Sequence, residues 1–513
     1  MLKPAPIFSN HMVLQRNKRI AIWGKAGQEK VTVSLNGSAV TAEGKDGSFF
    51  AELPPMAEGG PYCMEITDGT ETVTFEDVMV GEVWLAGGQS NMELELRNSF
   101  EGEKELERIQ PSNVRYYYVP KVAYFCDELL EEEEKSTWEC AGKEEAAKWS
   151  AVAYYFAKEV SEKLGMAVGI IGCNWGGTSA SCWTGRKMME QNKVISSYIE
   201  EYDKIVENQT LEEYIREREE YVVYQAEFDR KVAHYYQTCE HPTWVEAISL
   251  FGENKYPGPM GPYSECRPSG LYEVMLSRVC PYSLRGFLYY QGEEDDHKPD
   301  VYYELLSALI KQWRMDWKED SLPFLLVQLP VFQNEGEVDY KNWPLIREAQ
   351  MRAYQTIKNT GIAVILEQGE FGNIHPTKKD IVGKRLALQA FFHVYCLCGE
   401  KEAFGPVYRD YFTEGGKMTL LFDHCDGGFV QDGKVQGFEL AGSDKKYYPA
   451  DFTIEGERII LSSDEVDLPK YARYCWTNYQ EIALFGKNGI PLAPFRTSYG
   501  DGSRMIGSRN LPE

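Results

Sequence analysis

A serine stands at a glycine-rich turn directly after an apolar run. Residues 83–86 (Val-Trp-Leu-Ala) are typical of a buried β-strand, and the segment Gly-Gly-Gln-Ser-Asn-Met follows at 87–92. A serine in this position can project its hydroxyl into a cleft, as an acyl-transfer nucleophile must. A turn that merely contains serine would give the same local pattern, so a nucleophilic Ser90 is a hypothesis that other segments must support.

Polar residues also follow three other apolar runs, at 166–171, 286–290 and 363–366. Strands that alternate with amphipathic helices form parallel sheets, and ligands bind beyond the carboxyl ends of such strands. We therefore expect the residues that follow these runs to gather with Ser90 at one edge of a sheet. They are Gly176 and Gly177, Gln291 and Glu293, and His375.

A serine and a histidine at one sheet edge favour ester hydrolysis. A serine hydroxyl is too weakly acidic to attack a carbonyl unaided and needs an adjacent base. We predict that His375 accepts the proton of Ser90 and later passes it to the leaving alcohol. Pro376 restrains the backbone beside this histidine. The alternative for His375 is a place at the surface or at a helix cap.

The oxyanion of a tetrahedral intermediate needs hydrogen-bond donors aimed at the developing charge. The candidates are the backbone N–H of Ser90, the backbone N–H of Gly176 or Gly177, and the side-chain amide of Gln291. Glycine permits the close approach of backbone to a ligand. A simple tight turn would explain the two glycines equally well, and a buried carboxamide that ties loops together would explain Gln291.

Both ends of the chain have the pattern of β-structure. Residues 1–80 contain short apolar strands with Asn-Gly and Asp-Gly hairpin turns, which indicate a small N-terminal β-sandwich domain. Residues 401–513 again alternate short strands with Gly- and Asp-containing turns, and a second, C-terminal β domain is expected there.

The middle of the chain, 81–400, alternates strands with helices and predicts an α/β domain with a parallel sheet covered on both faces. Its clearest helix is expected at 145–164, where apolar residues recur on one face and Gly165 ends the pattern. A charged, aromatic segment of helical period interrupts the alternation at about 186–260. We interpret it as a solvated surface insertion, with a lid or a subunit contact as the alternatives.

Composition narrows the classes of function. The chain has 513 residues and a formal net charge of -25, which argues against nucleic acid as a partner because phosphate binding requires clustered Lys and Arg. No stretch reaches membrane-spanning length, and the first residues lack an apolar signal region. We therefore expect a cytoplasmic protein without a membrane partner, although a trimmed secretion signal would leave the same sequence. The sequence is compatible with a homo-oligomer and does not determine the oligomeric state.

The twelve cysteines are scattered, and free thiols in a reducing compartment are expected. Cys396 and Cys398 form the only close pair, and it lacks the second pair that a zinc site requires. A metal site is therefore not expected at this pair, and no cofactor is expected.

Four blocks together, at 88–92, 174–178, 290–293 and 374–376, resemble the sialate O-acetylesterase family of SGNH-type carbohydrate esterases. Further similar segments are His-Met-Val-Leu-Gln-Arg at 11–16, Gly-Glu-Val-Trp at 81–84, Leu-Ile-Arg-Glu-Ala-Gln at 345–350, Val-Gly-Lys-Arg-Leu-Ala at 382–387 and Pro-Phe-Arg-Thr at 494–497. The blocks occur in order over nearly the whole chain, apart from the charged insertion.

The resemblance implies an SGNH hydrolase core, a flavodoxin-like α/β/α fold in three layers, flanked by the two β domains. It also implies the metal-independent removal of O-acetyl groups from sialic acid, as by a sialate 9-O-acetylesterase, through an acyl-enzyme on Ser90 with His375 as the base. The alternatives are an acetylxylan- or mannan-type acetylesterase with the same machinery, and a non-catalytic carbohydrate-binding protein.

One position departs from the pattern of many SGNH hydrolases, which place an aspartate three residues before the histidine. Here that position is Gly372. A Ser–His dyad is the favoured interpretation, with a backbone carbonyl or Asn373 orienting the imidazole. Another acid is the alternative, with Glu370 as the nearest candidate and Glu367 or Glu293 as substitutes.

Three residues are candidates for substrate binding. Trp175 can offer an apolar face to a sugar ring, Glu293 can bind sugar hydroxyls, and Arg347 can meet a substrate carboxylate. Core packing for Trp175, a role in ordering the Gln291 loop for Glu293, and a structural ion pair for Arg347 are the competing interpretations.

Overall fold

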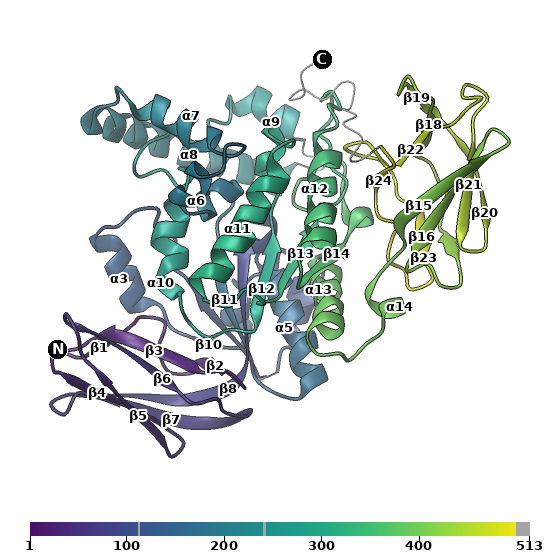
Figure 1. Ribbon diagram of the computed structural model, residues 1–513. Coiled ribbons are helices and arrows are strands. Elements are labelled where there is room, and N and C mark those ends of the chain that lie inside the picture. Colours follow the sequence, from purple (N-terminus) through teal and green to yellow (C-terminus); the bar gives the residue numbers. More distant parts are fainter. Residues whose placement is uncertain (111–112, 240–242, 499–513) are drawn as a thin grey trace.

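The computed structural model describes residues 1–110, 113–239 and 243–498 and has a mixed α/β architecture (Figure 1). The N-terminal strands lie at the lower left of the figure and the C-terminal strands at the right, with the central sheet and its helices between them. The prediction of an α/β fold class is thereby confirmed as a mixed α/β architecture. Of the helices in the described residues, none combines the length and the apolar character that a bilayer crossing needs.

The N-terminal strands form antiparallel groups with alternating burial. Strand β3 (Ile20–Lys25) pairs with β1 and β6, and β4 (Lys30–Leu35) pairs with β5 and β7. Asn36 and Asp46 have positive φ angles and precede glycines, as two-residue hairpin turns require. The other strands are β1 (Lys3–Pro4), β2 (Val13–Gln15), β5 (Ser38–Glu43), β6 (Ser48–Leu53) and β7 (Gly59–Thr67).

Strand β8 (Thr72–Gly88) joins the N-terminal strands to the central sheet. Its first part pairs with β7 and β2, and its last part pairs in parallel with β11 and β12. The central order is β10-β9-β11-β8-β12-β13-β14, in which only β10 is antiparallel to its neighbour. The bounds are β9 (Val114–Tyr118), β10 (Glu139–Cys140), β11 (Val168–Asn174), β12 (Gly286–Tyr290), β13 (Phe324–Gln328) and β14 (Thr360–Val364).

Helices pack on both faces of this sheet. Trp84 of β8 contacts the ring of Phe156 in α5, whereas a Cβ on Gly87 would meet Trp313 of α11. These two β8 positions are three apart and so face opposite sides of the sheet. The helices outside the insertion are α1 (Ser90–Glu93), α2 (Gly102–Arg108), α3 (Asp127–Lys135), α4 (Lys143–Ala146), α5 (Ala151–Leu164), α10 (Ser277–Val279), α11 (Tyr302–Asp316), α12 (Asn342–Thr356), α13 (Lys379–His393) and α14 (Glu400–Ala403).

The helix expected over 145–164 is two helices. The chain leaves α4 after Ala146, and α5 begins at Ala151 with Ser150 as its N-cap, whose Oγ accepts a hydrogen bond of 3.1 Å from the Ala153 N–H. A serine at this place satisfies a donor that the helix start leaves open. The predicted end is confirmed, because Gly165 adopts φ 68° at the C-cap.

The charged insertion is helical, as expected. It contains α6 (Arg186–Glu190), α7 (Ser197–Val206), α8 (Leu211–Thr238) and α9 (Trp244–Phe251). Thr210 and Glu213 form a capping box at the start of α8. Only a few α8 side chains are buried, among them Tyr214, Phe228 and Tyr235, which agrees with a mainly solvated surface.

The C-terminal strands form antiparallel sheets ordered β15-β16-β21-β20 and β19-β18-β22-β24, with β17 paired to β23. Their bounds are β15 (Val407–Glu414), β16 (Lys417–Asp423), β17 (Phe429–Gln431), β18 (Phe438–Ala441), β19 (Tyr447–Pro449), β20 (Asp451–Glu455), β21 (Arg458–Ser462), β22 (Tyr471–Tyr474), β23 (Leu484–Gly486) and β24 (Phe495–Arg496). The sequence at 435–440 predicts one of these strands, but β18 begins only at Phe438 because Gly437 has a positive φ that interrupts extended backbone.

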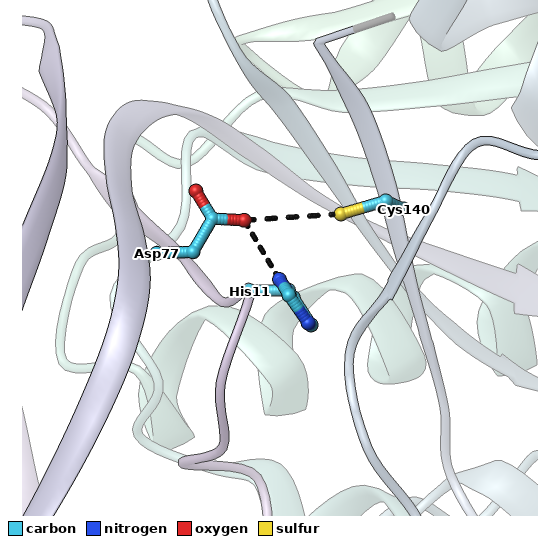
Figure 2. A group of neighbouring side chains, drawn as sticks. All are labelled: His11, Asp77 and Cys140. Carbon is cyan, nitrogen blue, oxygen red and sulfur yellow. Dashed lines mark hydrogen bonds and ion pairs between the residues drawn. The ribbon is translucent and has the colours of Figure 1, made fainter. Parts of the chain in front are cut away.

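His11, Asp77 and Cys140 lie together near the junction of β2, β8 and β10 (Figure 2). Asp77 Oδ2 is 2.7 Å from His11 Nδ1 and 4.0 Å from Cys140 Sγ. The guanidinium of Arg115 pairs with Asp77 Oδ1 at 3.0 Å and also donates to the His11 carbonyl at 2.9 Å. Because Arg115 already supplies a cation to this carboxylate, we assign the group to the attachment of the N-terminal strands.

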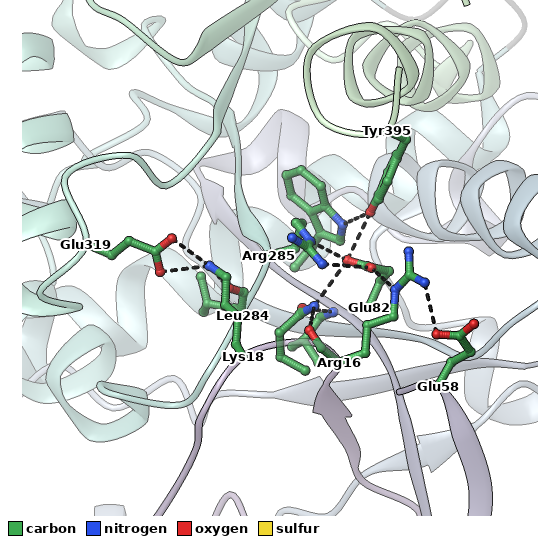
Figure 3. A network of polar contacts seen from close by, with 11 residues as sticks. Arg16, Lys18, Glu58, Glu82, Leu284, Arg285, Glu319 and Tyr395 are labelled. Carbon is green, nitrogen blue, oxygen red and sulfur yellow. Dashed lines mark hydrogen bonds and ion pairs between the residues drawn. The ribbon is translucent and has the colours of Figure 1, made fainter. Parts of the chain in front are cut away.

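Glu82 anchors the start of the parallel part of β8 (Figure 3). Its carboxylate has no exposed surface and accepts hydrogen bonds from Arg16 and, at 2.7 Å and 3.1 Å, from Arg285. Tyr395 and Gln15 add contacts of 3.2 Å and 3.3 Å. The buried carboxylate therefore ties the N-terminal strands to β12 and α13.

We expect Glu82→Ala to lower the free energy of unfolding by about 3–5 kcal/mol, because it leaves two guanidinium groups partly buried without their carboxylate. Denaturant unfolding followed by circular dichroism measures this change. Glu58→Ala is the matched control, since it removes the exposed carboxylate of the same Arg16 and should cost less than about 1 kcal/mol. Equal losses in the two variants would contradict the anchoring role of Glu82.

Candidate active site

The ends of three neighbouring parallel strands surround Ser90. Strand β8 ends at Gly88, two residues before Ser90, while β11 and β12 end beside it at Asn174 and Tyr290. Gly88 has φ 133°, and a Cβ there would lie 2.1 Å from the Tyr290 carbonyl oxygen. Only glycine allows this close backbone contact, which turns the chain sharply into α1 and leaves Ser90 at its first residue.

Ser90 and His375 are in hydrogen-bond contact, although 285 residues separate them in the chain. Ser90 Oγ lies 2.8 Å from His375 Nε2. The prediction that the loop after β14 brings this histidine to the serine is therefore confirmed by the geometry. With the ring proton on Nδ1, Nε2 is free to accept the serine proton, as a general base must.

Neither Asn373, the orienting residue of the favoured dyad, nor Glu370, the nearest alternative acid, contacts the imidazole ring. Asn373 Oδ1 accepts a 3.0 Å hydrogen bond from the His375 backbone N–H, and Asn373 Nδ2 donates to Glu370 at 2.8 Å. Glu370 also accepts from the Thr377 N–H at 3.1 Å. Both residues thus hold the backbone of the histidine loop. Within the described part of the chain, His375 Nδ1 has no hydrogen-bond partner, so the geometry is that of a dyad.

The imidazole of His375 is held neutral. Burial of part of the ring lowers its pKa to about 4, and the positive charge of Lys379 acts in the same direction, while Glu93 opposes both. The outer side of His375 is nevertheless exposed to solvent. A neutral imidazole is the form that can accept a proton, so the group is ready to act as a base at neutral pH.

Two of the expected oxyanion donors are available and two are not. In the described residues, the N–H groups of Ser90 and Gly177 have no protein acceptor. The N–H of Gly176 donates to Glu93 Oε2 at 2.6 Å, so this expected donor is already engaged. A Cβ on Gly177 would clash with Tyr256, and its φ of 67° also requires glycine.

The expectation that Gln291 donates to the oxyanion is wrong. Its Nε2 donates to Asp295 at 2.6 Å and to the Thr178 carbonyl at 3.3 Å, which uses both amide hydrogens. Its Oε1 accepts from Tyr302 at 2.9 Å, and the residue is 1% exposed. Gln291 is therefore the buried carboxamide that ties loops together, which the sequence had left as the alternative.

Two of the three substrate-binding candidates are also corrected. Arg347 is completely buried and donates to the carbonyls of Pro330, Cys475 and Thr477, so it joins α12 to the C-terminal strands. Glu293 is buried and accepts a 2.6 Å hydrogen bond from Asn91. Trp175 packs partly against the core and keeps some exposed surface.

A cavity of about 700 Å³ opens in front of the dyad. Its lining residues include Ser90, His375 and Gly176, together with Glu93, Lys121 and Lys148. A second cavity, of about 690 Å³, is lined by residues such as Arg285, Pro323 and Thr360 at the opposite ends of the strands, and none of the predicted site residues lines it. The first cavity therefore marks the site.

Four residues near the dyad were not identified from the sequence. Glu93 binds Gly176 and forms an ion pair with Lys121. Asn91 and Lys379 bind each other below the dyad. Asn91 and Glu93 follow the serine within one helical turn, and Lys379 lies four residues after the histidine, so proximity to the predicted dyad was the available signal.

Comparisons with known proteins show similarity to carbohydrate esterases. A family model described as "Carbohydrate esterase, sialic acid-specific acetylesterase" matches residues 262–391, which contain His375 but not Ser90. Sialate O-acetylesterase from Mus musculus is 27% identical over 96% of this chain and 93% of its own length. The Homo sapiens protein of that name is 25% identical over 96% and 91%.

A solved structure extends the likeness to three dimensions. The crystal structure of a carbohydrate acetylesterase from Xanthomonas citri superposes with a TM-score of 0.76 and 28% identity, covering 96% of this chain and 99% of that chain. The resemblance expected from the sequence blocks is confirmed, and so is the expectation of an esterase.

Proposed function

We propose that this chain, which resembles sialate O-acetylesterases over nearly its whole length, is a carbohydrate O-acetylesterase with Ser90 as nucleophile and His375 as base. The observation that carries the proposal is the 2.8 Å separation of Ser90 Oγ and His375 Nε2 at the wall of a cavity. Under this proposal the α/β part at 81–400 is an SGNH hydrolase core, and the flanking parts at 1–80 and 401–513 are β-sandwich-like domains.

The reaction takes place in two halves. Ser90 Oγ attacks the acetyl carbonyl carbon while His375 Nε2 takes the hydroxyl proton, and the carbonyl oxygen becomes an oxyanion. When the intermediate collapses, the imidazolium protonates the departing sugar oxygen. The sugar alcohol is released, and the acetyl group remains bound to Ser90 as an ester. Water then attacks this ester with His375 again as base, and acetate leaves as Ser90 regains its proton.

The backbone N–H groups of Ser90 and Gly177 are the proposed oxyanion donors, because no protein acceptor among the described residues occupies them. One such donor contributes about 3–4 kcal/mol to transition-state stabilisation when it is aimed at the developing charge. Glu93, which holds the Gly176 N–H at 2.6 Å, keeps the adjoining turn in place.

Sialic acid esters are the first candidate substrates, since the sialate O-acetylesterases are similar along almost the entire chain. The cavity favours a second candidate, an acetylated neutral glycan such as xylan or mannan. Both lysines that line the cavity are in ion pairs, Lys121 with Glu93 and Lys148 with Glu139 at 2.7 Å. A sialic acid carboxylate would have to displace one of these partly buried carboxylates from its lysine.

Acetate release from O-acetylated sialic acid and from acetylated xylan, with wild type and Ser90→Ala, tests the proposal. We expect the wild type to release acetate and Ser90→Ala to release none from either substrate. A higher kcat/KM for the sialic acid ester that falls in Lys121→Met would identify Lys121 as the partner of the substrate carboxylate. Higher kcat/KM on acetylated xylan than on the sialic acid ester, in the wild type and in Lys121→Met, would favour the neutral glycan. If the wild type released no acetate from either substrate, the esterase proposal would be contradicted.

A further inference from the structure

A buried lysine lies directly beneath the proposed catalytic pair. Lys379 is the first residue of α13 and is 1% exposed. Its Nζ donates to Asn91 Oδ1, and Asn91 is the residue after Ser90. A lysine is rarely buried to this extent without a partner of opposite charge. The mechanism proposed above makes no use of it.

Asn91 connects the serine turn to the histidine loop. Its Nδ2 donates to Glu293 Oε1 at 2.6 Å and to the carbonyl oxygen of Ile374 at 2.9 Å. Because Asn91 follows Ser90 and Ile374 precedes His375, the second of these hydrogen bonds joins the direct chain neighbours of the two proposed catalytic residues. With Lys379 on its oxygen, both N–H donors and the acceptor oxygen of this amide are engaged.

Charge balances across this amide. Glu293 is buried, and its Oε2 has no hydrogen-bond partner among the described residues. Burial raises the pKa of Glu293, whereas burial lowers the pKa of Lys379 to about 7 against the opposing attraction of Glu293 and Glu370. Burial thus favours the neutral form of each group, while each group favours the charged form of the other across Asn91.

We propose that Lys379, Asn91 and Glu293 form a buried positioning unit that holds the Ser90 turn and the His375 loop at reacting distance, where no acid among the described residues contacts the imidazole. The proposal rests on the proposed esterase function. The unit acts through the backbone neighbours of the pair and through the charge of Lys379. The triad acid of other hydrolases acts instead through a hydrogen bond to the histidine ring.

The unit also contributes to the proton affinity of the base. Burial lowers the pKa of His375 most, Lys379 from α13 lowers it further, and Glu93 from α1 raises it. At acidic pH Lys379 is fully charged, so its effect is greatest where His375 titrates. Removal of this charge should therefore raise the pKa of His375. If the lysine had only a structural role, its removal would leave the pKa of His375 unchanged.

The test compares Lys379→Met, Lys379→Gln and the control Lys378→Met by the pH dependence of kcat/KM for p-nitrophenyl acetate. Lys378 is exposed and immediately precedes Lys379. In the wild type we expect kcat/KM to fall only as the pH drops through about 4, where His375 gains its proton. In Lys379→Met we expect kcat about 10–100-fold lower, with KM nearly unchanged, and an acid limb about 1 pH unit higher.

Lys379→Gln keeps a donor for Asn91 but carries no charge, so it should regain part of kcat while the acid limb stays shifted. Thermal unfolding shows whether each variant is folded. If Lys379→Met does not fold, the comparison of Lys379→Gln with the wild type provides the test. Wild-type kcat and an unshifted acid limb in a folded Lys379 variant would overturn the positioning role. An inactive wild type would instead overturn the esterase function.

Discussion

Ser90→Ala should lower kcat for acetyl ester hydrolysis by at least about 10⁴-fold, because it removes the atom that forms the acyl-enzyme. The half-buried side chain donates to no core group that the substitution would leave unsatisfied, so thermal unfolding should be unchanged. Initial rates of acetate release at saturating substrate measure the loss.

Ser307→Ala is the matched control for this experiment. Ser307 lies on α11, where its hydroxyl bonds to the Tyr303 carbonyl, and it does not line the cavity in front of the dyad. It should retain wild-type activity. Turnover by Ser90→Ala within about tenfold of the wild type would remove Ser90 from the reaction.

His375→Ala should lower kcat/KM by about 10²–10⁴-fold, the usual contribution of a general base. The size of the loss should depend on the leaving group. A sugar alkoxide needs the proton that His375 returns, whereas p-nitrophenolate leaves without one. We therefore expect a larger loss on an acetylated sugar than on p-nitrophenyl acetate, measured as kcat/KM for both esters at pH 7.

His234→Ala is the control for this variant, because His234 is exposed on α8 in the insertion. It should behave as the wild type on both esters. Equal losses by His375→Ala on the two esters would mean that the histidine does not protonate the leaving group.

Local sequence patterns predicted much of the scaffold. The strand expected at 286–290 coincides with β12. Helical periodicity in the sequence predicts helices at 302–317 and 343–357, and α11 ends one residue earlier whereas α12 begins and ends one residue earlier. The hydrophobic periodicity of a single segment is sufficient to predict helices and strands of this kind. The strand expected at 363–366 instead forms as Thr360–Val364, because Leu366 enters a 3₁₀ turn that redirects the chain toward His375.

The pairing of Ser90 and His375 could be predicted because parallel strands end at one edge and the family resemblance named both residues. The side-chain partners in the site could not be predicted in the same way. Gln291 and Glu293 follow a strand end as substrate-facing residues would, but Thr178 and Asn91 bind them from other segments. Such contacts depend on packing between loops, which spacing along one segment does not reveal.

Arg347 illustrates the same limit. The sequence around Arg347 is compatible with an exposed or a buried guanidinium. Its contacts with the C-terminal part of the chain show that it is buried. The carbonyls of Cys475 and Thr477 lie more than a hundred residues away in the chain and accept its hydrogen bonds. A buried guanidinium with carbonyl partners stabilises the junction and is closed to substrate.

Labelling with a fluorophosphonate tests most directly whether a serine and a histidine from distant segments act together at one cavity. The probe reacts with activated serines, and peptide mass spectrometry locates the adduct. We predict stoichiometric labelling of Ser90 in the wild type and little labelling in His375→Ala at the same pH. An adduct on another serine, or equally rapid labelling of Ser90 without the imidazole, would contradict the account.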